Sequence, residues 1–247
     1  MRIALLTDIH ANREALTACL EHASRREVDR YALLGDFVGY GADPSWVVDQ
    51  IIKLRAQGAI AVLGNHDAAI FESRGEQMNE DAHQAVEWTR SQLNPGQIDF
   101  LRSLPLSHED AGVLYVHANA WAPGQFAYIA GDMDADRSMH ATSARITFCG
   151  HVHDQMLYHL GRAQRVAAFQ PVAGSPIPLS SSRRWLAIAG SCGQPRDGNP
   201  AACYAIFDQR TSILTFYRVP YDYDQAARKI RDVGLPQRLA SRLEGGI

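Results

Sequence analysis

The stretch Ala59-Ile60-Ala61-Val62-Leu63-Gly64-Asn65-His66-Asp67 joins an apolar run to a short polar block. We interpret the run as a buried strand and the block as the turn that leaves the sheet at the carboxyl end of that strand. In open α/β sheets, ligands bind at this edge. The stretch therefore predicts an amide, an imidazole and a carboxylate at the edge where chemistry is expected.

Four other apolar runs end in the same way. They are residues 3–6, 31–34, 113–116 and 146–149. The polar residues that follow them and carry metal-binding chemistry are Asp8, His10, Asp36, His117, His151 and His153. Because strand after strand delivers such residues at its end, the pattern predicts one shared metal site.

The candidate ligands, with Asn65 added to these six, offer nitrogen and oxygen donors and no thiolate. Such a set suits Mn, Fe, Zn, Co or Ni better than copper(I) or an iron–sulfur cluster. Asp36 has two carboxylate oxygens, which is enough to bridge two cations. Two divalent ions about 3.5–4 Å apart lower the pKa of a shared water and clamp both oxygens of a phosphoryl transfer. We therefore expect two divalent metal ions as cofactors, with Mn²⁺ first among them.

His66 follows the candidate ligand Asn65 and is better placed to act on a substrate than to hold a metal. We predict that it protonates a leaving oxygen or binds a phosphate oxygen, and that Asp67 orients its ring. Asn65 is a candidate for substrate binding as well as for metal. Arg196 is the other candidate, since its glycine-rich loop combines backbone N–H groups with a guanidinium that can meet an anion.

The bulk properties are those of a globular protein. The chain has 247 residues, 46% of them hydrophobic and 21% charged, with a net charge of -3. We expect one domain over residues 1–247. The charge balance does not favour nucleic-acid binding, and no apolar run approaches the ~18 residues of a membrane helix. The widely spaced cysteines are interpreted as buried thiols of a cytoplasmic protein.

Strands and helices alternate in the first third, which predicts parallel pairing through βαβ units. Helices are expected near residues 15–23 and 44–57, as two segments within 79–104, and again at the C-terminus. From about residue 105 the short apolar runs predict mostly antiparallel strands. These runs are residues 104–106, 113–116, 146–149, 155–158, 166–169, 185–189, 203–207 and 213–217. The run 185–217 is a candidate edge of the second sheet, where another subunit could pair.

Residues 118–144 form the longest segment without clear periodicity, so we expect a lid or loop over the site. The segment contains Trp121, Phe126 and Tyr128, which as a hypothesis stack on the base of a nucleotide substrate; packing is the alternative. Tyr40 lies just after the second polar block and is a candidate pocket residue, with packing again the alternative.

Five polar blocks in this order resemble those of the calcineurin-like metallophosphoesterase superfamily. The blocks are Asp8-Ile9-His10, Gly35-Asp36, Gly64-Asn65-His66-Asp67, His117 and Gly150-His151-Val152-His153. The resemblance covers roughly residues 1–155 and implies a four-layer α/β/β/α sandwich of two mixed β-sheets flanked by helices. It implies one metal on Asp8, His10, Asp36 and His153, and another on Asp36, Asn65, His117 and His151. It also implies in-line attack by a metal-bound hydroxide, with His66 as the acid or phosphate-binding histidine.

Residues 190–200 are similar to a block of small bacterial and archaeal phosphoesterases. The second block continues Phe37-Val38-Gly39, where Ser/Thr protein phosphatases carry Asp-Arg-Gly, and this disfavours a protein phosphatase. We therefore expect a phosphodiesterase, a phosphomonoesterase or both, acting on a small phosphate ester. The alternatives are a nucleotide or dinucleoside polyphosphate hydrolase, and a non-catalytic binding or scaffold protein of the same fold.

Overall fold

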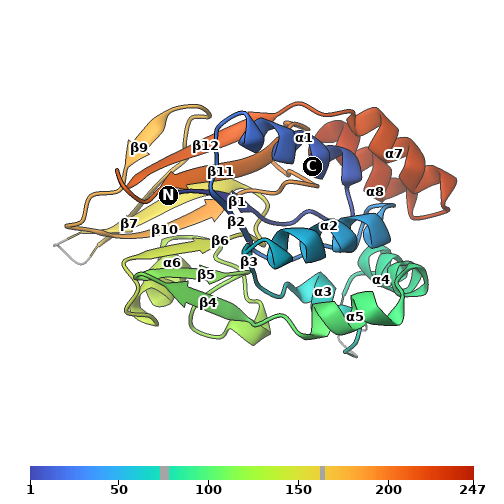
Figure 1. Ribbon diagram of the computed structural model, residues 1–247, viewed down its shortest axis with the longest axis horizontal. Helices are drawn as coiled ribbons and strands as arrows, with labels where there is room; N and C mark the ends of the chain where they lie inside the picture. Colours follow the sequence, from blue (N-terminus) through green and yellow to red (C-terminus); the bar gives the residue numbers. More distant parts are fainter. Residues whose placement is uncertain (73–77, 162–164) are drawn as a thin grey trace.

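A computed structural model describes residues 1–72, 78–161 and 165–247 of the chain. Two six-stranded sheets pack face to face, and helices cover their outer faces (Figure 1). Helices, two sheets and again helices make the expected four layers in Figure 1. Both sheets also mix parallel and antiparallel neighbours, as expected.

The first sheet has the strand order β3-β2-β1-β11-β12-β9. Its parallel part is β1 (Arg2–Leu6), β2 (Arg30–Leu33) and β3 (Ile60–Ala61). Its antiparallel part is β11 (Ala202–Asp208), β12 (Ile213–Val219) and β9 (Pro176–Pro178). The parallel part supplies three strand ends to one edge.

The second sheet has the order β4-β5-β6-β10-β7-β8. Its central strands β5 (Val113–Val116), β6 (Ile146–Cys149) and β10 (Arg184–Ala189) are parallel to one another. The outer strands β4 (Ser107–Asp110), β7 (Gln155–Leu160) and β8 (Val166–Phe169) pair antiparallel. Most pairings of the strands after residue 105 are therefore antiparallel, as predicted, and the exceptions are β5 with β6 and β6 with β10.

Three clusters of buried apolar side chains hold the four layers together. Ile3 and Leu5 of β1 meet Tyr115 and Phe148 of the second sheet in the core between the sheets. The alternate residues of β1, such as Leu6, face the other way and pack beneath α1 and α2, as the two-residue period of a strand requires. A third cluster joins the outer face of the second sheet to α6.

The helices begin and end largely where the sequence predicts. Near the first sheet they are α1 (Arg13–Ser24), α2 (Pro44–Ala56), α3 (Asn65–Ala69), α4 (Glu80–Gln92) and α5 (Pro95–Arg102). The 3₁₀ turn η2 (Pro123–Gln125) and α6 (Asp132–His140) lie within the segment predicted to be a lid or loop. The C-terminal helices are α7 (Tyr223–Asp232) and α8 (Gln237–Gly245).

Some expectations are wrong. Residues 104–106 are not a strand, since β4 begins at Ser107. The run 185–217 is not an edge of the second sheet, because β10 lies inside that sheet and β11 and β12 lie inside the first. The cause is a crossover between sheets that local hydropathy does not encode. Pairing with another subunit through this run is therefore not proposed.

Two expectations from the composition, on membrane helices and on cysteines, can be compared with the structure. In the described parts of the chain, no helix combines the length and apolarity that a membrane crossing needs. All four cysteines are buried and free, as expected. The single domain over residues 1–247 stays a prediction.

Candidate metal centre

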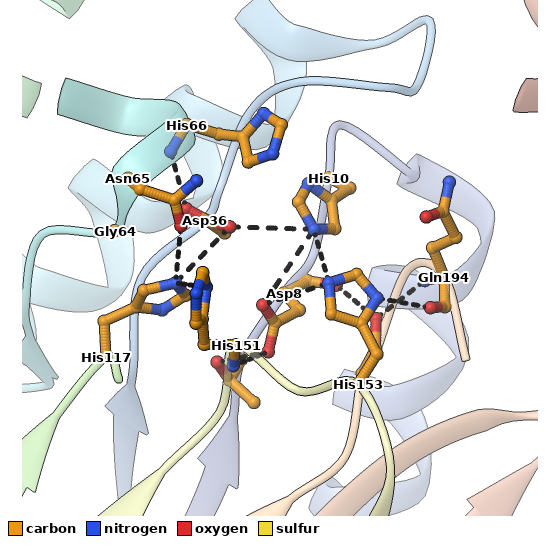
Figure 2. Close-up of polar contacts among 12 residues, drawn as sticks. Asp8, His10, Asp36, Gly64, Asn65, His66, His117, His151, His153 and Gln194 are labelled. Carbon is orange, nitrogen blue, oxygen red and sulfur yellow. Dashed lines mark hydrogen bonds and ion pairs between the residues drawn. The ribbon is translucent and has the colours of Figure 1, made fainter. Parts of the chain in front are cut away.

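The seven predicted metal ligands come together at the carboxyl ends of strands from both sheets (Figure 2). Asp8 and His10 follow β1, Asp36 follows β2, and Asn65 begins α3 after β3. From the second sheet, His117 follows β5, and the loop after β6 carries the other two ligands, His151 and His153. Six of the seven, all except Asn65, are buried.

The loops that carry these ligands are held in unusual backbone conformations. Asp8, His10, Asp36, His151 and His153 all have left-handed φ angles, between 49° and 72°. Such conformations cost of order 1–3 kcal/mol each for residues other than glycine and persist where surrounding contacts determine them. The strain concentrates at the site, which is typical of a functional centre.

The first group of ligand atoms is that of Asp8, His10 and His153, which all lie within 4.8 Å of one another. The two imidazole Nε2 atoms are 3.1 Å apart. The Oδ1 atom of Asp8 lies 3.4 Å from His153 Nε2 and, although it is buried, has no hydrogen-bond partner among the described residues. Its Oδ2 atom accepts from the backbone N–H of His151, at 2.9 Å.

The second group is Asp36, His117 and His151, also within 4.8 Å. Asn65 joins it, since its Oδ1 atom is 3.1 Å from His117 Nε2. His117 Nε2 also lies 3.2 Å from His151 Nδ1 and 3.4 Å from Asp36 Oδ2. Because the same Asp36 Oδ2 atom is 3.8 Å from His10 Nε2, Asp36 stands between the two groups.

Backbone carbonyls fix which nitrogen of three rings carries the proton. The Nδ1 atoms of His10, His117 and His153 contact the carbonyls of Val38, Leu34 and Gln194 at 3.1, 2.7 and 2.6 Å. A carbonyl only accepts, so each Nδ1 is the donor and each Nε2 of a neutral ring presents its lone pair. Lone pairs of His10 and His153 thus face each other across 3.1 Å, an arrangement that a cation between them would satisfy.

The electrostatics of the centre favour positive charge. Burial would lower the pKa of His117, but the Asp36 carboxylate outweighs it and raises that pKa to about 9. Burial would raise the pKa of Asp36, but His117 and His66 hold it well below its usual range. The Asp36 carboxylate is therefore ionised near neutral pH.

The His66 ring lies above Asp36 and beside His10 in Figure 2, at the border of the metal centre. Its ring centroid is 5.0 Å from that of His10 and 4.4 Å from that of Tyr40. A ring nitrogen of His66 also lies within 4.8 Å of ligand atoms of His10 and Asp36. Burial lowers the pKa of His66 to about 4, so the ring is neutral near pH 7. The structure therefore brings His66 to the centre, as predicted.

The expectation that Asp67 orients the His66 ring is wrong. The Asp67 carboxylate accepts from the backbone N–H groups of Phe37, Val38 and Gly64, at 2.8, 3.2 and 3.1 Å. In the part of the chain that the structure describes, His66 Nδ1 has no partner. Asp67 instead ties together the loops after β2 and β3. Burial, and after it the negative charge of Asp36, raises the pKa of Asp67 to about 7.

A cavity of about 320 Å³ opens beside the centre. Tyr128 and Phe126 line it together with Asn65, His66 and His151. The Tyr128 ring, which is 54% exposed, stacks on His151 with centroids 4.1 Å apart. The 118–144 segment thus reaches the site through these aromatic residues, whereas α6 covers the second sheet.

Of the other predicted site residues, Tyr40 and Arg196 border the metal centre and Trp121 does not. Tyr40 lines the cavity, and the Arg196 guanidinium carbon lies 6.0 Å from its ring centroid, so both border the centre. Trp121 does not line the cavity; the Arg137 guanidinium packs on its ring at 4.8 Å. A stacking role for Trp121 is therefore wrong.

Gln194 is a residue at the site that the sequence reasoning did not single out. Its carbonyl accepts from His153, and its buried side-chain Nε2 has no partner within residues 1–72, 78–161 and 165–247. The signal was present in the Gly193-Gln194-Pro195-Arg196 block, but nothing local distinguished the glutamine from an ordinary loop residue.

A two-sheet α/β sandwich with nitrogen and oxygen donors gathered at its strand ends defines a metallophosphoesterase fold. Residues 1–212 match the sequence model of the calcineurin-like phosphoesterase superfamily domain, and the chain belongs to this superfamily. The resemblance seen in the sequence is thus confirmed.

Relatives extend over nearly the whole chain. An uncharacterized protein from Methanocaldococcus jannaschii is 33% identical over 98% of this chain and 96% of its own. The crystal structure of a metallophosphoesterase from Sphaerobacter thermophilus is 34% identical, with a TM-score of 0.87 over 100% of this chain and 99% of its own. A hypothetical protein from Pyrococcus horikoshii OT3 shares the fold at 20% identity, with a TM-score of 0.80 over 100% and 98% of the two chains.

Proposed function

We propose that the protein is a two-metal phosphoesterase that hydrolyses a small phosphate ester. The observation that carries this proposal is the convergence of lone pairs from His10, His153 and Asp8 on one point and of His117, His151 and Asn65 on another, with Asp36 between them. The family membership and the metallophosphoesterase from Sphaerobacter thermophilus support it.

The donor set fits two divalent cations. The buried Asp8 Oδ1 atom has no partner among the described residues, and leaving a buried polar atom unpaired is costly; His151 turns its Nδ1 atom toward His117 Nε2, at 3.2 Å. One ion would be held by Asp8, His10, Asp36 and His153, and the other by Asp36, Asn65, His117 and His151. Such ions, Mn²⁺ first among Fe, Zn, Co and Ni, would supply Lewis acidity and lower the pKa of a coordinated water.

The residues of the chain then bind and orient the substrate. His66, neutral near pH 7, donates its N–H to a phosphate oxygen or to the leaving oxygen. Asn65 adds an amide N–H₂ beside it, and Arg196 neutralises phosphate charge beyond Tyr40. Asp67 acts indirectly, because its hydrogen bonds hold the loops that carry Asp36 and His66.

The substrate class is a small phosphodiester or phosphomonoester, and a nucleotide or dinucleoside polyphosphate is the second candidate. The cavity lined by Tyr128 and Phe126 favours this second candidate, because a planar base can stack on an exposed ring. Free, buried cysteines support a reducing, cytoplasmic location.

Hydrolysis of an aryl phosphodiester and an aryl phosphomonoester tests the proposal. Metal-stripped protein resupplied with Mn²⁺ should regain turnover of at least one. Removing a residue that donates a proton or hydrogen bond in the transition state costs about 10²–10⁴-fold, so His66→Ala should lose at least 100-fold while still binding metal. His140→Ala, on the exposed side of α6, is the matched control and should keep full turnover.

Turnover of diadenosine tetraphosphate, measured beside the aryl esters, separates the two substrate classes. Efficient cleavage would favour the nucleotide candidate, and no cleavage would exclude it. Protein that binds two ions and yet cleaves no substrate would contradict an enzyme and favour a binding or scaffold role.

A further inference from the structure

The ring of His66, the proposed donor to the substrate, is not held by the kind of hydrogen bond that holds its neighbours. The Nδ1 atoms of His10, His117 and His153 each contact a backbone carbonyl. His66 Nδ1 is buried, yet it has no hydrogen-bond partner in the described part of the chain. The adjacent Asp67 carboxylate accepts from backbone N–H groups instead. Packing must therefore set the direction of the His66 ring.

Gly39 closes one edge of this ring. Its φ is +86°, and a Cβ built on it would lie 2.6 Å from His66 Nδ1 and 3.1 Å from His66 Cγ. The backbone of Gly39 thus packs directly against the imidazole, an approach that a residue with a side chain could not make. His66 lines the cavity beside the centre. Because Nδ1 is buried, Nε2 is the ring nitrogen left to reach a substrate in that cavity.

Tyr40 packs against the same ring. The two ring centroids are 4.4 Å apart, with the planes tilted by 59°. The Tyr40 ring also contacts His10 at a centroid distance of 4.5 Å. The His10 and His66 rings lie side by side (Figure 2), with centroids 5.0 Å apart. One tyrosine ring, only 7% exposed, therefore touches both a predicted metal ligand and the proposed donor.

Two helices fix the position of Tyr40. Leu239 and Leu243 of α8 share one apolar cluster with Tyr40 and with Ala82 and Ala85 of α4, and the two helices lie at the same end of the molecule (Figure 1). The backbone at Tyr40 is left-handed, with a φ of 63°, which is an outlier for a bulky residue. Such conformations persist where surrounding contacts determine them, and they concentrate at functional sites. Tyr40 is thus a fixed wall for the His66 ring.

The two histidines depend on Tyr40 to different degrees. The ring of His10 has its own anchor, since its Nδ1 atom contacts the Val38 carbonyl at 3.1 Å. His66 is anchored through its backbone, where the N–H donates to Asp36 Oδ1 at 2.9 Å, while its ring is held by packing alone. Loss of the Tyr40 ring should therefore leave His10 in place and free the His66 side chain to rotate.

We propose that Tyr40 is a positioning residue for His66. Its ring, together with the backbone of Gly39, holds the imidazole so that Nε2 faces the substrate. Tyr40 thereby takes the role that the sequence assigned to Asp67, and it acts through its ring and not through its hydroxyl. This inference rests on the proposed function, in which His66 donates to a phosphate or leaving oxygen.

A double-mutant cycle tests whether Tyr40 acts through His66. The assay uses Mn²⁺-loaded protein and whichever aryl ester the wild type cleaves better. A misplacement of about 1 Å can cost on the order of 100-fold in rate, so Tyr40→Leu should lower kcat at least tenfold. Tyr40→Phe keeps the ring and should stay within threefold. In His66→Ala protein, Tyr40→Leu should change kcat less than twofold, because the residue that it positions is already gone. Additive losses would overturn the proposal.

Mn²⁺ affinity separates positioning of His66 from damage to the metal site. Tyr40→Leu should bind Mn²⁺ within threefold of the wild type, because His10 keeps its own hydrogen bond. A tenfold loss of Mn²⁺ affinity beside the loss of kcat would overturn the proposal, and so would an equal loss of kcat in Tyr40→Phe. Gly39→Ala, whose added Cβ presses on His66 Nδ1, is the second variant if Tyr40→Leu folds poorly. Its loss of kcat should likewise disappear in His66→Ala protein.

NMR of Zn²⁺-loaded protein with ¹³Cε1-labelled histidine reads the ring without turnover. The His66 signal is assigned by its absence in His66→Ala. It should be single and sharp in the wild type and in Tyr40→Phe, and should broaden or split in Tyr40→Leu, while the His10 signal stays sharp. A single, sharp His66 signal in Tyr40→Leu would overturn the proposal. Order of His66 that depends on Tyr40, in a protein that cleaves no ester, would leave the positioning role standing and contradict the hydrolase.

Discussion

Gly64→Ala is expected to disable the metal centre through a single added methyl group. Gly64 ends the apolar run before Asn65, and its φ is an ordinary -99°. A Cβ there would lie 2.2 Å from both the backbone N and the Oδ1 atom of Asp36. The effect is therefore purely steric, and it falls on the carboxylate that stands between the two groups of ligands.

The size of the effect follows from these distances. The added carbon is about 1 Å closer to Asp36 than ordinary van der Waals contact at 3.4 Å, so the carboxylate must move by a comparable amount. Metal–ligand distances tolerate only about 0.2 Å. The shift also breaks the hydrogen bond from the His66 N–H to Asp36 Oδ1, now 2.9 Å long. Overpacking of this kind costs about 1–3 kcal/mol of stability.

The assay combines Mn²⁺ titration with urea unfolding. Gly64→Ala should bind Mn²⁺ at least 10–100-fold more weakly than wild type, the range seen when ligand-orienting contacts are lost, and should unfold about 1–3 kcal/mol more easily. Gly131→Ala, where a Cβ meets open space, is the control and should keep wild-type affinity. Wild-type Mn²⁺ affinity and turnover in Gly64→Ala would refute the role given to Asp36.

Three further perturbations have defined outcomes. Asp67→Asn places an N–H₂ against a buried backbone N–H, so urea unfolding should show a loss of about 1–3 kcal/mol; an unchanged midpoint would contradict this. Lys229→Met removes ion pairs to Glu14 and Asp43 at 2.5 and 2.8 Å, worth about 0.2–1 kcal/mol each at a partly exposed position. Burial lowers the pKa of Lys229, but the two carboxylates raise it above 10.5. The stabilisation is therefore complete below pH 10.5 and lost as the pH rises through the higher folded-state pKa, where the melting temperatures of variant and wild type should converge. Chelation of protein loaded at about 100 times the metal Kd should remove about 2.7 kcal/mol of stability, and an unchanged melting temperature would argue against bound metal.

The sequence predicts the position of the centre well because the signal is local. An apolar run followed by Asp, His or Asn marks both the strand and the residue at its end, as at β1 with Asp8 and β6 with His151. The polar ends converge only because the two sheets pack face to face, which brings the strand ends of both sheets together. The superfamily resemblance anticipates that packing, while periodicity alone does not.

The remaining features depend on contacts between distant segments. The adjacency of Asp67 and His66 predicts that Asp67 orients the His66 ring. Its hydrogen-bond partners instead include the backbone N–H groups of Phe37 and Val38, which belong to another loop. Helix α6 escapes prediction because its apolar face is short, with only Ala135, Ser138 and Met139 buried.

Anomalous diffraction from crystals soaked in Mn²⁺ tests the central claim most directly. Two peaks are predicted, one among Asp8, His10 and His153 and the other among Asn65, His117 and His151, with Asp36 between them. A single peak, or ions bound away from these residues, would contradict a two-metal phosphoesterase.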